Sequence, residues 1–553
     1  MLASIFRRKN INVEIENSEK ENHNGLSRVL GVRDLTSFGI AAIIGAGIFS
    51  TIGRASFEGG PAVSLLFLFV SLACVFTALC YAQFASMVPV SGSAYTYAYV
   101  SFGEIFAWII GWSLILEYAV SNMVVAISWS EYFVGMLKGF GVNFPNFLAI
   151  DYGTAHKAYL TSLDSTIVLS ASEKIALLAY NNAPQLGPLK ILMDLPAGLI
   201  TVLVTLLVYV GIKESRVASN FLVILKLLVI VLVIAVGAFY IKPENWSPFA
   251  PNGVKGVLGG VASVFFAFIG FDSISTTAEE CKNPQRDLPR AMIYCLAICA
   301  FLYVCITLVL TGMVNYTELK VDDPLAYVFH KVNLNFVAGI ISVSAVIAIT
   351  SALLVYQMGQ PRIWMAMSRD GLLWKRFSNI HPKFRTPSFA TIVTGFVVAI
   401  PSLFLDMGFF VDLTSVGTFF AFILVCAGVL YLDYQGLSKN AKFKIPYING
   451  KYIVGLIFII AFAYHIKENI LISTIQEKPL LLVFWIVWAS LSVLSFLFKC
   501  SILPVMGILT NLYLMTELGI SNWLIFTIWL AIGLIIYFMY GYKNSKLNLI
   551  KKY

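Results

Sequence analysis

Long apolar stretches recur along almost the whole chain, and they constrain its fold more than any other feature. A segment of about 20 apolar residues is long enough to cross a bilayer as a helix, and about fourteen such segments can be placed. They lie near residues 34–54, 61–87, 104–137, 194–212, 217–241, 255–278, 290–314, 335–361, 387–405, 409–432, 452–466, 480–498, 502–516 and 522–541. The pattern predicts an all-α polytopic membrane protein.

Composition and charge agree with lipid as the solvent. Of the 553 residues, 59% are hydrophobic and 12% are charged, whereas soluble domains carry about 25% charged residues. The net charge is +9, but the Lys and Arg residues lie in short loops between apolar segments. This arrangement is typical of a protein embedded in a bilayer and does not indicate a nucleic-acid partner.

The distribution of basic residues predicts the orientation. An even number of spans places both termini on one side, and the loops on that side carry most of the 38 Lys and Arg residues, with the densest cluster in 362–387. We therefore expect both termini in the cytoplasm. The chain shows no targeting peptide, so we expect the plasma membrane, and specifically a bacterial inner membrane.

Gly45-Ala46-Gly47 interrupts the first apolar segment. Glycine within a helix weakens it and leaves backbone groups free, and free amides at the start of a half-helix bind carboxylates. The alternative is that these small residues only allow close helix packing. A substrate-carboxylate site and a packing contact therefore both remain open at this segment.

A second interruption runs from Phe266 to Asp272 in the sixth segment and contains Gly270. Interrupted segments at corresponding places in two halves of a chain are the strongest sequence indication of a transporter binding site. Spans one to five and six to ten would form those halves. The alternative is a glycine kink, with Asp272 facing the polar interior.

Two charged residues lie inside apolar segments. Lys226 is about nine residues, or roughly 14 Å, into the fifth span. A charge at this depth is a functional candidate, and burial favours the neutral amine, so Lys226 can gain and lose a proton; the alternative is that it snorkels to the interface. Glu117 is mid-way along the third span. It is a candidate for a polar cavity, and equally for a structural hydrogen bond.

Chemistry of other kinds finds no support in the sequence. We see no phosphate-binding loop, catalytic triad or metal-ligand spacing, so the chain is not expected to be an enzyme or an ATP-driven pump. No metal and no organic cofactor is expected. A channel would need a repeated filter or a ring of charges, and neither is visible in the sequence.

Several motifs resemble the amino acid–polyamine–organocation (APC) superfamily, and within it the branch similar to cationic amino acid transporters. The resemblance covers most of 30–541. The matching stretches are LGVRDLTSFGIAAIIGAGIFSTIG (30–53), MVPVSGSAYTYAYVSFGE (87–104), FFAFIGFDSISTTAEECKNPQRDLPRAM (265–292), MGQPRIWMAMSRDGLLWKRF (358–377) and, near the end, NLYLM…WLAIGLIIYFMYG (511–541).

The resemblance implies a leucine-transporter-like fold of five plus five spans in inverted repeat. It divides the chain as follows: a cytoplasmic tail (1–33), a first repeat (34–241) with an extracytoplasmic loop of at most short helices (138–193), a second repeat (255–432), additional C-terminal spans (452–541) and a cytoplasmic tail (542–553). Residues 452–498 add two spans that twelve-span family members lack, and no motif in 138–193 matches the family. We expect the N-terminal tail to be mobile.

The resemblance also implies transport of an L-amino acid by alternating access. The substrate carboxylate would lie at the first break, near Gly45 and the amides of Ala46 and Gly47, and its amine would meet the Ile43 carbonyl. The second break would offer the carbonyls of Phe266, Ala267 and Ile269. Glu117 is the acidic candidate near the pocket for the side chain.

Lys226 matches the fifth-span lysine of proton-coupled relatives, which implies a proton, and not sodium, as the coupling ion. An amino acid or amine exchanger and a non-transporting amino acid sensor are the alternatives, although the chain has no signalling domain. The sequence leaves open which amino acid is carried, the oligomeric state and whether an accessory membrane helix binds.

Overall fold

The computed structural model describes residues 5–9, 29–88, 92–164, 169–187, 189–211, 215–321, 323–384, 386–467 and 478–550. Parts of both predicted tails (1–4, 10–28 and 551–553) and residues 468–477 of the additional spans lie outside these ranges. Among the described residues, nine helices are long and apolar enough to cross a membrane, and four shorter helices are also apolar. The prediction of an all-α polytopic membrane protein is confirmed.

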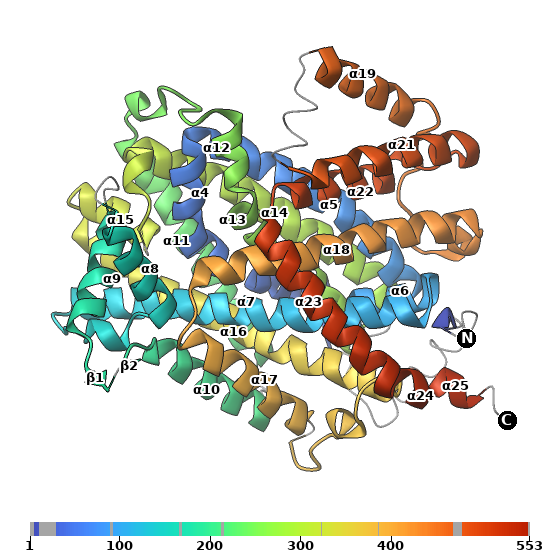
Figure 1. Ribbon diagram of the computed structural model, residues 1–553, viewed down its shortest axis with the longest axis horizontal. Helices are drawn as coiled ribbons and strands as arrows, with labels where there is room; N and C mark the ends of the chain where they lie inside the picture. The colour runs from blue at the N-terminus through green and yellow to red at the C-terminus, as the bar shows by residue number, and fades with distance from the viewer. Residues whose placement is uncertain are drawn as a thin grey trace.

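The first five predicted spans each correspond to helices, and the first is broken. The helices are α3 (Val32–Ile43), η1 (Gly47–Thr51) and α4 (Ile52–Gly59) for the first span, then α5 (Val63–Met87), α7 (Glu104–Gly139), α10 (Leu195–Val210) and α11 (Ser215–Gly237). A short helix, α6 (Ser93–Ser101), precedes α7. α7 is the most enclosed of the long spans of this half and runs across the middle of the molecule (Figure 1).

The next five predicted spans repeat this plan, and again the first is broken. The helices are α12 (Gly253–Gly259), α13 (Val261–Phe266) and η6 (Phe271–Glu280) for the sixth span, then α14 (Pro284–Met313), α16 (Asn335–Arg369), α17 (Ser388–Ser402) and α18 (Met407–Tyr434). A short helix, α15 (Pro324–Lys331), lies before α16.

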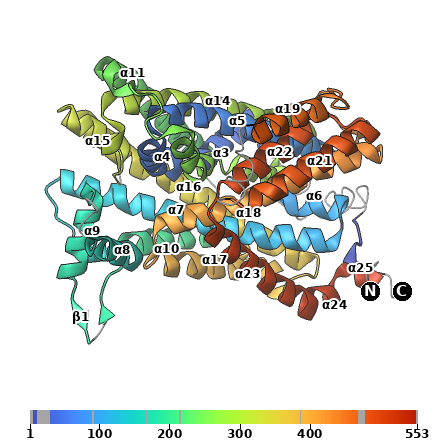
Figure 2. The same cartoon turned by 45° about the horizontal axis from the view of Figure 1, so that its top comes forward.

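The remaining helices lie outside the two groups of five spans. The C-terminal spans are α19 (Ile453–Lys467), α21 (Leu480–Phe498), α22 (Ile502–Thr516) and α23 (Ile520–Ile536), followed by η10 (Tyr537–Gly541), α24 (Tyr542–Asn544) and α25 (Lys546–Ile550). The loop of 138–193 forms α8 (Tyr152–Ser162), α9 (Ala171–Asn182) and a hairpin of β1 (Gln185–Leu186) and β2 (Leu189–Lys190), as Figure 2 shows. α19 and α21 pack with α22 in a small aromatic cluster of their own.

Helix contacts reveal an internal symmetry between the two groups of five spans. Corresponding helices pack together: α5 against α14, α7 against α16 and α10 against α17. The last helix of each group makes equivalent contacts. α11 contacts α3 of its own group and α16 of the other group, and its counterpart α18 contacts α13 of its own group and α7 of the other. Each group has an odd number of spans, so the second is inverted relative to the first. This arrangement places the two broken spans, α3–α4 and α12–η6, in equivalent positions.

The N-terminal segment departs from the expectation of a mobile tail. Arg7 is buried, and its guanidinium forms a 2.9 Å ion pair with Glu104 at the start of α7. The Glu104 amide donates to the Arg7 carbonyl at 2.9 Å, and Lys9 pairs with Asp370 at 2.8 Å. Mobility was expected because the segment is polar and charged. Residues 5–9 instead dock on the folded chain, because Arg7 reaches the buried Glu104 and Lys9 reaches the half-buried Asp370.

Candidate functional site

The first break separates α3 from η1 at Ile44–Ala46. Ile44 leaves the helical conformation, with φ −79° and ψ 85°, and the next turn begins when Phe49 donates to the Gly45 carbonyl at 3.3 Å. Within the described chain, the amides of Ala46, Gly47 and Ile48 donate to no backbone or side-chain acceptor. The second half-helix thus begins with three free donors, the arrangement that binds a carboxylate.

The carbonyls at the end of α3 are in the opposite situation, because side chains of α11, α14 and α16 reach them, the last of these being Tyr356, which donates to Ala42 at 3.4 Å. The Lys226 ammonium of α11 donates to Ile44 at 2.9 Å and to Ala41 at 3.3 Å. The Tyr303 hydroxyl of α14 donates to Ile43 at 2.9 Å. An α-helix leaves its last four carbonyls without partners, and polar side chains supply those partners within the membrane region.

The second break follows α13. The chain makes two tight turns, in which Phe268 donates to Phe265 at 2.9 Å and Ile269 donates to Phe266 at 3.2 Å. Gly270 then takes φ +115°, a conformation that only glycine adopts without strain. η6 begins at Phe271, so the turn at Gly270 ends one half-helix and starts the next.

The predicted carbonyls of the second break differ in what reaches them. The Phe266 carbonyl accepts from the amide of Ile269, and the Ile269 carbonyl accepts from the Tyr356 hydroxyl of α16 at 3.0 Å. Among the described residues, no donor reaches the carbonyl of Ala267. Each carbonyl has two lone pairs, so Phe266, Ala267 and Ile269 all retain acceptor capacity.

The two breaks touch. A Cβ on Gly47 would lie 2.4 Å from the Cα of Ala267, and a Cβ on Gly270 would lie 2.8 Å from the Cβ of Ala42. Gly45 faces α16, where a Cβ would be 2.8 Å from the Cβ of Ala352. The glycines therefore serve close packing as well as the backbone break, so the packing contact expected as an alternative is present, and the substrate-carboxylate site stays a prediction.

Lys226 is 1% exposed, and its ammonium lies against the end of α3 as described above. The alternative in which Lys226 snorkels to the interface is therefore wrong. The partial negative charge at a helix C-terminus stabilises a cation there. The amine thus connects the fifth span to the first break through two hydrogen bonds.

Glu117 lies in a buried acidic pair with Asp272, which the sequence-based reading did not place in the site. The two carboxylates are close enough to interact electrostatically, and Thr418 of α18 lies near Glu117, although its hydroxyl donates to the Thr414 carbonyl at 3.1 Å. One oxygen of each carboxylate, Glu117 Oε2 and Asp272 Oδ2, has no donor among the described residues. The hydroxyls of Tyr81 and Tyr118 are nearby and likewise unpaired. These groups form a buried polar cluster beside the second break.

Sequence reasoning also missed Tyr303 and Tyr356. Both are aromatic residues in apolar segments, so their neighbours predict only core packing. The single available signal was a hydroxyl at a depth where water cannot satisfy it. Such a hydroxyl needs a protein acceptor, and the nearest bare carbonyls in a membrane helix are those at a break.

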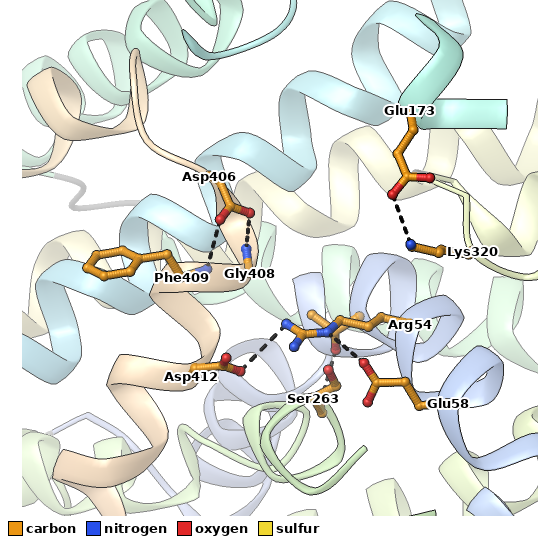
Figure 3. A network of polar contacts seen from close by, with 10 residues as sticks. Arg54, Glu58, Glu173, Ser263, Lys320, Asp406, Gly408, Phe409 and Asp412 are labelled. Carbon is orange, nitrogen blue, oxygen red and sulfur yellow. Dashed lines mark hydrogen bonds and ion pairs between the residues drawn. The ribbon is translucent and has the colours of Figure 1, made fainter. Parts of the chain in front are cut away.

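A second polar group joins α4, the second half of the first span, to the tenth span (Figure 3). Arg54 of α4 lies 3.2 Å from Glu58 and 3.5 Å from Asp412 of α18. Asp406 caps the start of α18 by accepting from the amide of Gly408 at 2.8 Å. These contacts hold α4 against α18 on the side that carries the 138–193 loop, because Lys320 pairs there with Glu173 of α9 at 3.1 Å.

Known families and proteins match the chain along almost its whole length. A family model described as "Amino acid permease" matches residues 30–491, and one described as the C-terminus of that permease matches 501–545. The branched-chain amino acid permease BcaP of Bacillus subtilis is 37% identical over 99% of this chain and 100% of its own. The methylthioribose transporter of the same organism is 36% identical with the same coverage. The vacuolar cationic amino acid transporter 2 of Arabidopsis thaliana is 31% identical over 99% of this chain and 94% of its own.

Proposed function

The chain belongs to the amino acid permease family, so it is a multi-pass membrane transporter and not an enzyme, and we propose that it imports L-amino acids. We propose proton symport through alternating access as the mechanism. Its family was predicted from the motifs, and that prediction is confirmed. We further place it in a bacterial inner membrane with both termini in the cytoplasm, as the basic loops indicate.

The observation that carries the proposal is the contact between the two breaks, one with free amides and the other with free carbonyl capacity. The amides of Ala46, Gly47 and Ile48 offer three donors to a carboxylate, and Gly47 packs on the Cα of Ala267, a residue whose carbonyl no described donor reaches. An amino acid is a zwitterion, so its carboxylate and ammonium need such groups side by side. Fixed backbone dipoles replace the water around these charges with little rearrangement.

Lys226 supports a proton as the coupling ion. Its ammonium bonds to the carbonyls of Ala41 and Ile44, and backbone oxygens of this kind are the ligands that a sodium ion would need. A proton gradient can drive the cycle only if the two facing states bind the proton with different affinity. Because Lys226 bridges the fifth span and the first break, a movement of either one changes the surroundings of its amine.

The test is uptake into proteoliposomes that contain the purified protein. We expect a labelled amino acid to accumulate when the outside is made acidic, and an imposed sodium gradient at equal pH to have no effect. A competition screen of the common L-amino acids then identifies the substrate side chain. Counterflow that runs equally fast without any pH gradient, together with no gradient-driven accumulation, would favour the exchanger instead.

The Glu117–Asp272 pair bears on which substrate side chain the carrier accepts. The relatives are named for different substrates, branched-chain amino acids in one case and cationic amino acids in another. Two buried carboxylate oxygens without donors favour a cationic partner. We expect Glu117→Gln to weaken competition by lysine and arginine about tenfold, the effect of losing a charge-assisted hydrogen bond of about 1.4 kcal/mol, and to leave leucine within about twofold.

Thr418→Val is the matched control for Glu117→Gln, because it removes a hydroxyl beside Glu117 and keeps the negative charge. It should change all substrates alike. Equal weakening of lysine and leucine by Glu117→Gln would show that the pair does not read the substrate's charge.

A further inference from the structure

Tyr356 connects both breaks through a single hydroxyl. Its Oη lies 3.0 Å from the carbonyl oxygen of Ile269 in the sixth span and 3.4 Å from that of Ala42 in the first span. The side chain comes from α16, which belongs to neither broken span, and it is 4% exposed. One hydroxyl proton is therefore shared between two carbonyls that lie in different helices.

The surrounding residues fix this position of the hydroxyl. A Cβ on Gly270 would lie 2.9 Å from the Tyr356 Oη, so the absence of a side chain at 270 makes room for the oxygen. The Tyr356 ring packs edge-on against Tyr118, with 5.9 Å between centroids and an interplanar angle of 79°. The turn at Gly270 and the helix α7 thus both contact the tyrosine.

The hydroxyl donates to the kind of group that the substrate ammonium needs. Under the proposed function, on which this inference rests, the ammonium is bound by carbonyls of the two breaks, Ile269 among them. A hydroxyl and an ammonium both place an N–H or O–H donor against those oxygens. Without either, the carbonyls would be buried and unpaired, which is costly inside a membrane.

A donor that stays on these carbonyls without substrate matters for the step in which the unloaded carrier reorients. A symporter must reorient without substrate after each delivery, whereas an obligatory exchanger must not. The energy of the unloaded, closed site decides which of the two a carrier becomes, since only differences between states shift their populations. A resident donor that satisfies the carbonyls of both breaks lowers that energy.

We propose that the Tyr356 hydroxyl replaces the substrate ammonium between the two broken spans when the carrier is unloaded, and thereby permits net transport. Tyr356 is in this sense a positioning residue for the return step. Its hydroxyl keeps the first and sixth spans hydrogen-bonded to α16 while the unloaded carrier reorients, when no substrate links the two spans.

The experiment compares two fluxes in proteoliposomes containing wild type or Tyr356→Phe. Counterflow, with substrate on both sides, needs only the loaded carrier to reorient. Net efflux into substrate-free buffer also needs the unloaded carrier to return. We expect the ratio of net efflux to counterflow to fall about tenfold in Tyr356→Phe, the factor that corresponds to one hydrogen bond of about 1.4 kcal/mol.

Tyr303→Phe is the matched control. It removes a hydroxyl that also donates to a carbonyl expected near the substrate ammonium, Ile43, but that hydroxyl reaches the first break alone and does not link it to the second. It should change both fluxes by the same factor. A ratio that stays at the wild-type value in Tyr356→Phe, whether both fluxes fall together or neither falls, overturns the inference. Absence of amino acid counterflow in the wild type would instead overturn the proposed function.

Discussion

Gly47→Ala is expected to reduce transport by up to about a hundredfold while the protein still folds. The new Cβ would lie 2.4 Å from the Cα of Ala267 and 2.8 Å from its Cβ, so one of the two breaks must move. Overpacking of this kind costs about 1–3 kcal/mol, and about 2.7 kcal/mol is a hundredfold in rate. The loss falls on transport because the displaced groups are the amides and carbonyls proposed to bind the substrate.

Counterflow of a labelled amino acid measures the effect, and thermal unfolding of the purified protein separates it from misfolding. Gly339→Ala is the matched control, since a Cβ there meets no atom within 4 Å. It should retain wild-type transport. Normal counterflow by Gly47→Ala would mean that the contact between the breaks is not part of the site.

The sequence was sufficient to place the backbone features of this site. Glycine signals a break because it weakens a helix wherever it occurs, so Gly45, Gly47 and Gly270 marked both interruptions before any contact was known. Lys226 was equally visible, because an ammonium deep in an apolar segment requires a partner. The helices of all the predicted spans follow from their length and apolar composition.

The side chains that complete the site could not be found in the same way. Tyr303 and Tyr356 read as core aromatics, and their role depends on which helix face meets the end of α3. Asp272 was noted as interrupting an apolar segment, yet its pairing with Glu117 arises from packing between spans far apart in sequence. Burial of Arg7 against Glu104 was hidden for the same reason, since a polar tail looks the same whether or not it docks.

Lys226 gives the second prediction with a large effect. We expect neither Lys226→Gln nor Lys226→Arg to accumulate substrate against its gradient when the outside is acidic. Glutamine cannot carry the proton and arginine cannot release it. Both side chains still donate hydrogen bonds, so the carbonyls of Ala41 and Ile44 keep a donor within reach, which Lys226→Ala would remove.

The two variants together separate a titrating lysine from a fixed charge. Accumulation is measured in proteoliposomes as the ratio of inside to outside substrate, and it should fall to the equilibrium value of about one in both variants, because a symporter without a coupling ion only equilibrates its substrate. Counterflow should persist in at least one of them, since it needs no net proton movement.

If Lys226→Arg still accumulates substrate, a permanent positive charge at the end of α3 suffices there, and the proton must be carried elsewhere. The Glu117–Asp272 pair would then be the candidate carrier beside the second break, because both carboxylates are buried there and each retains an oxygen without a donor.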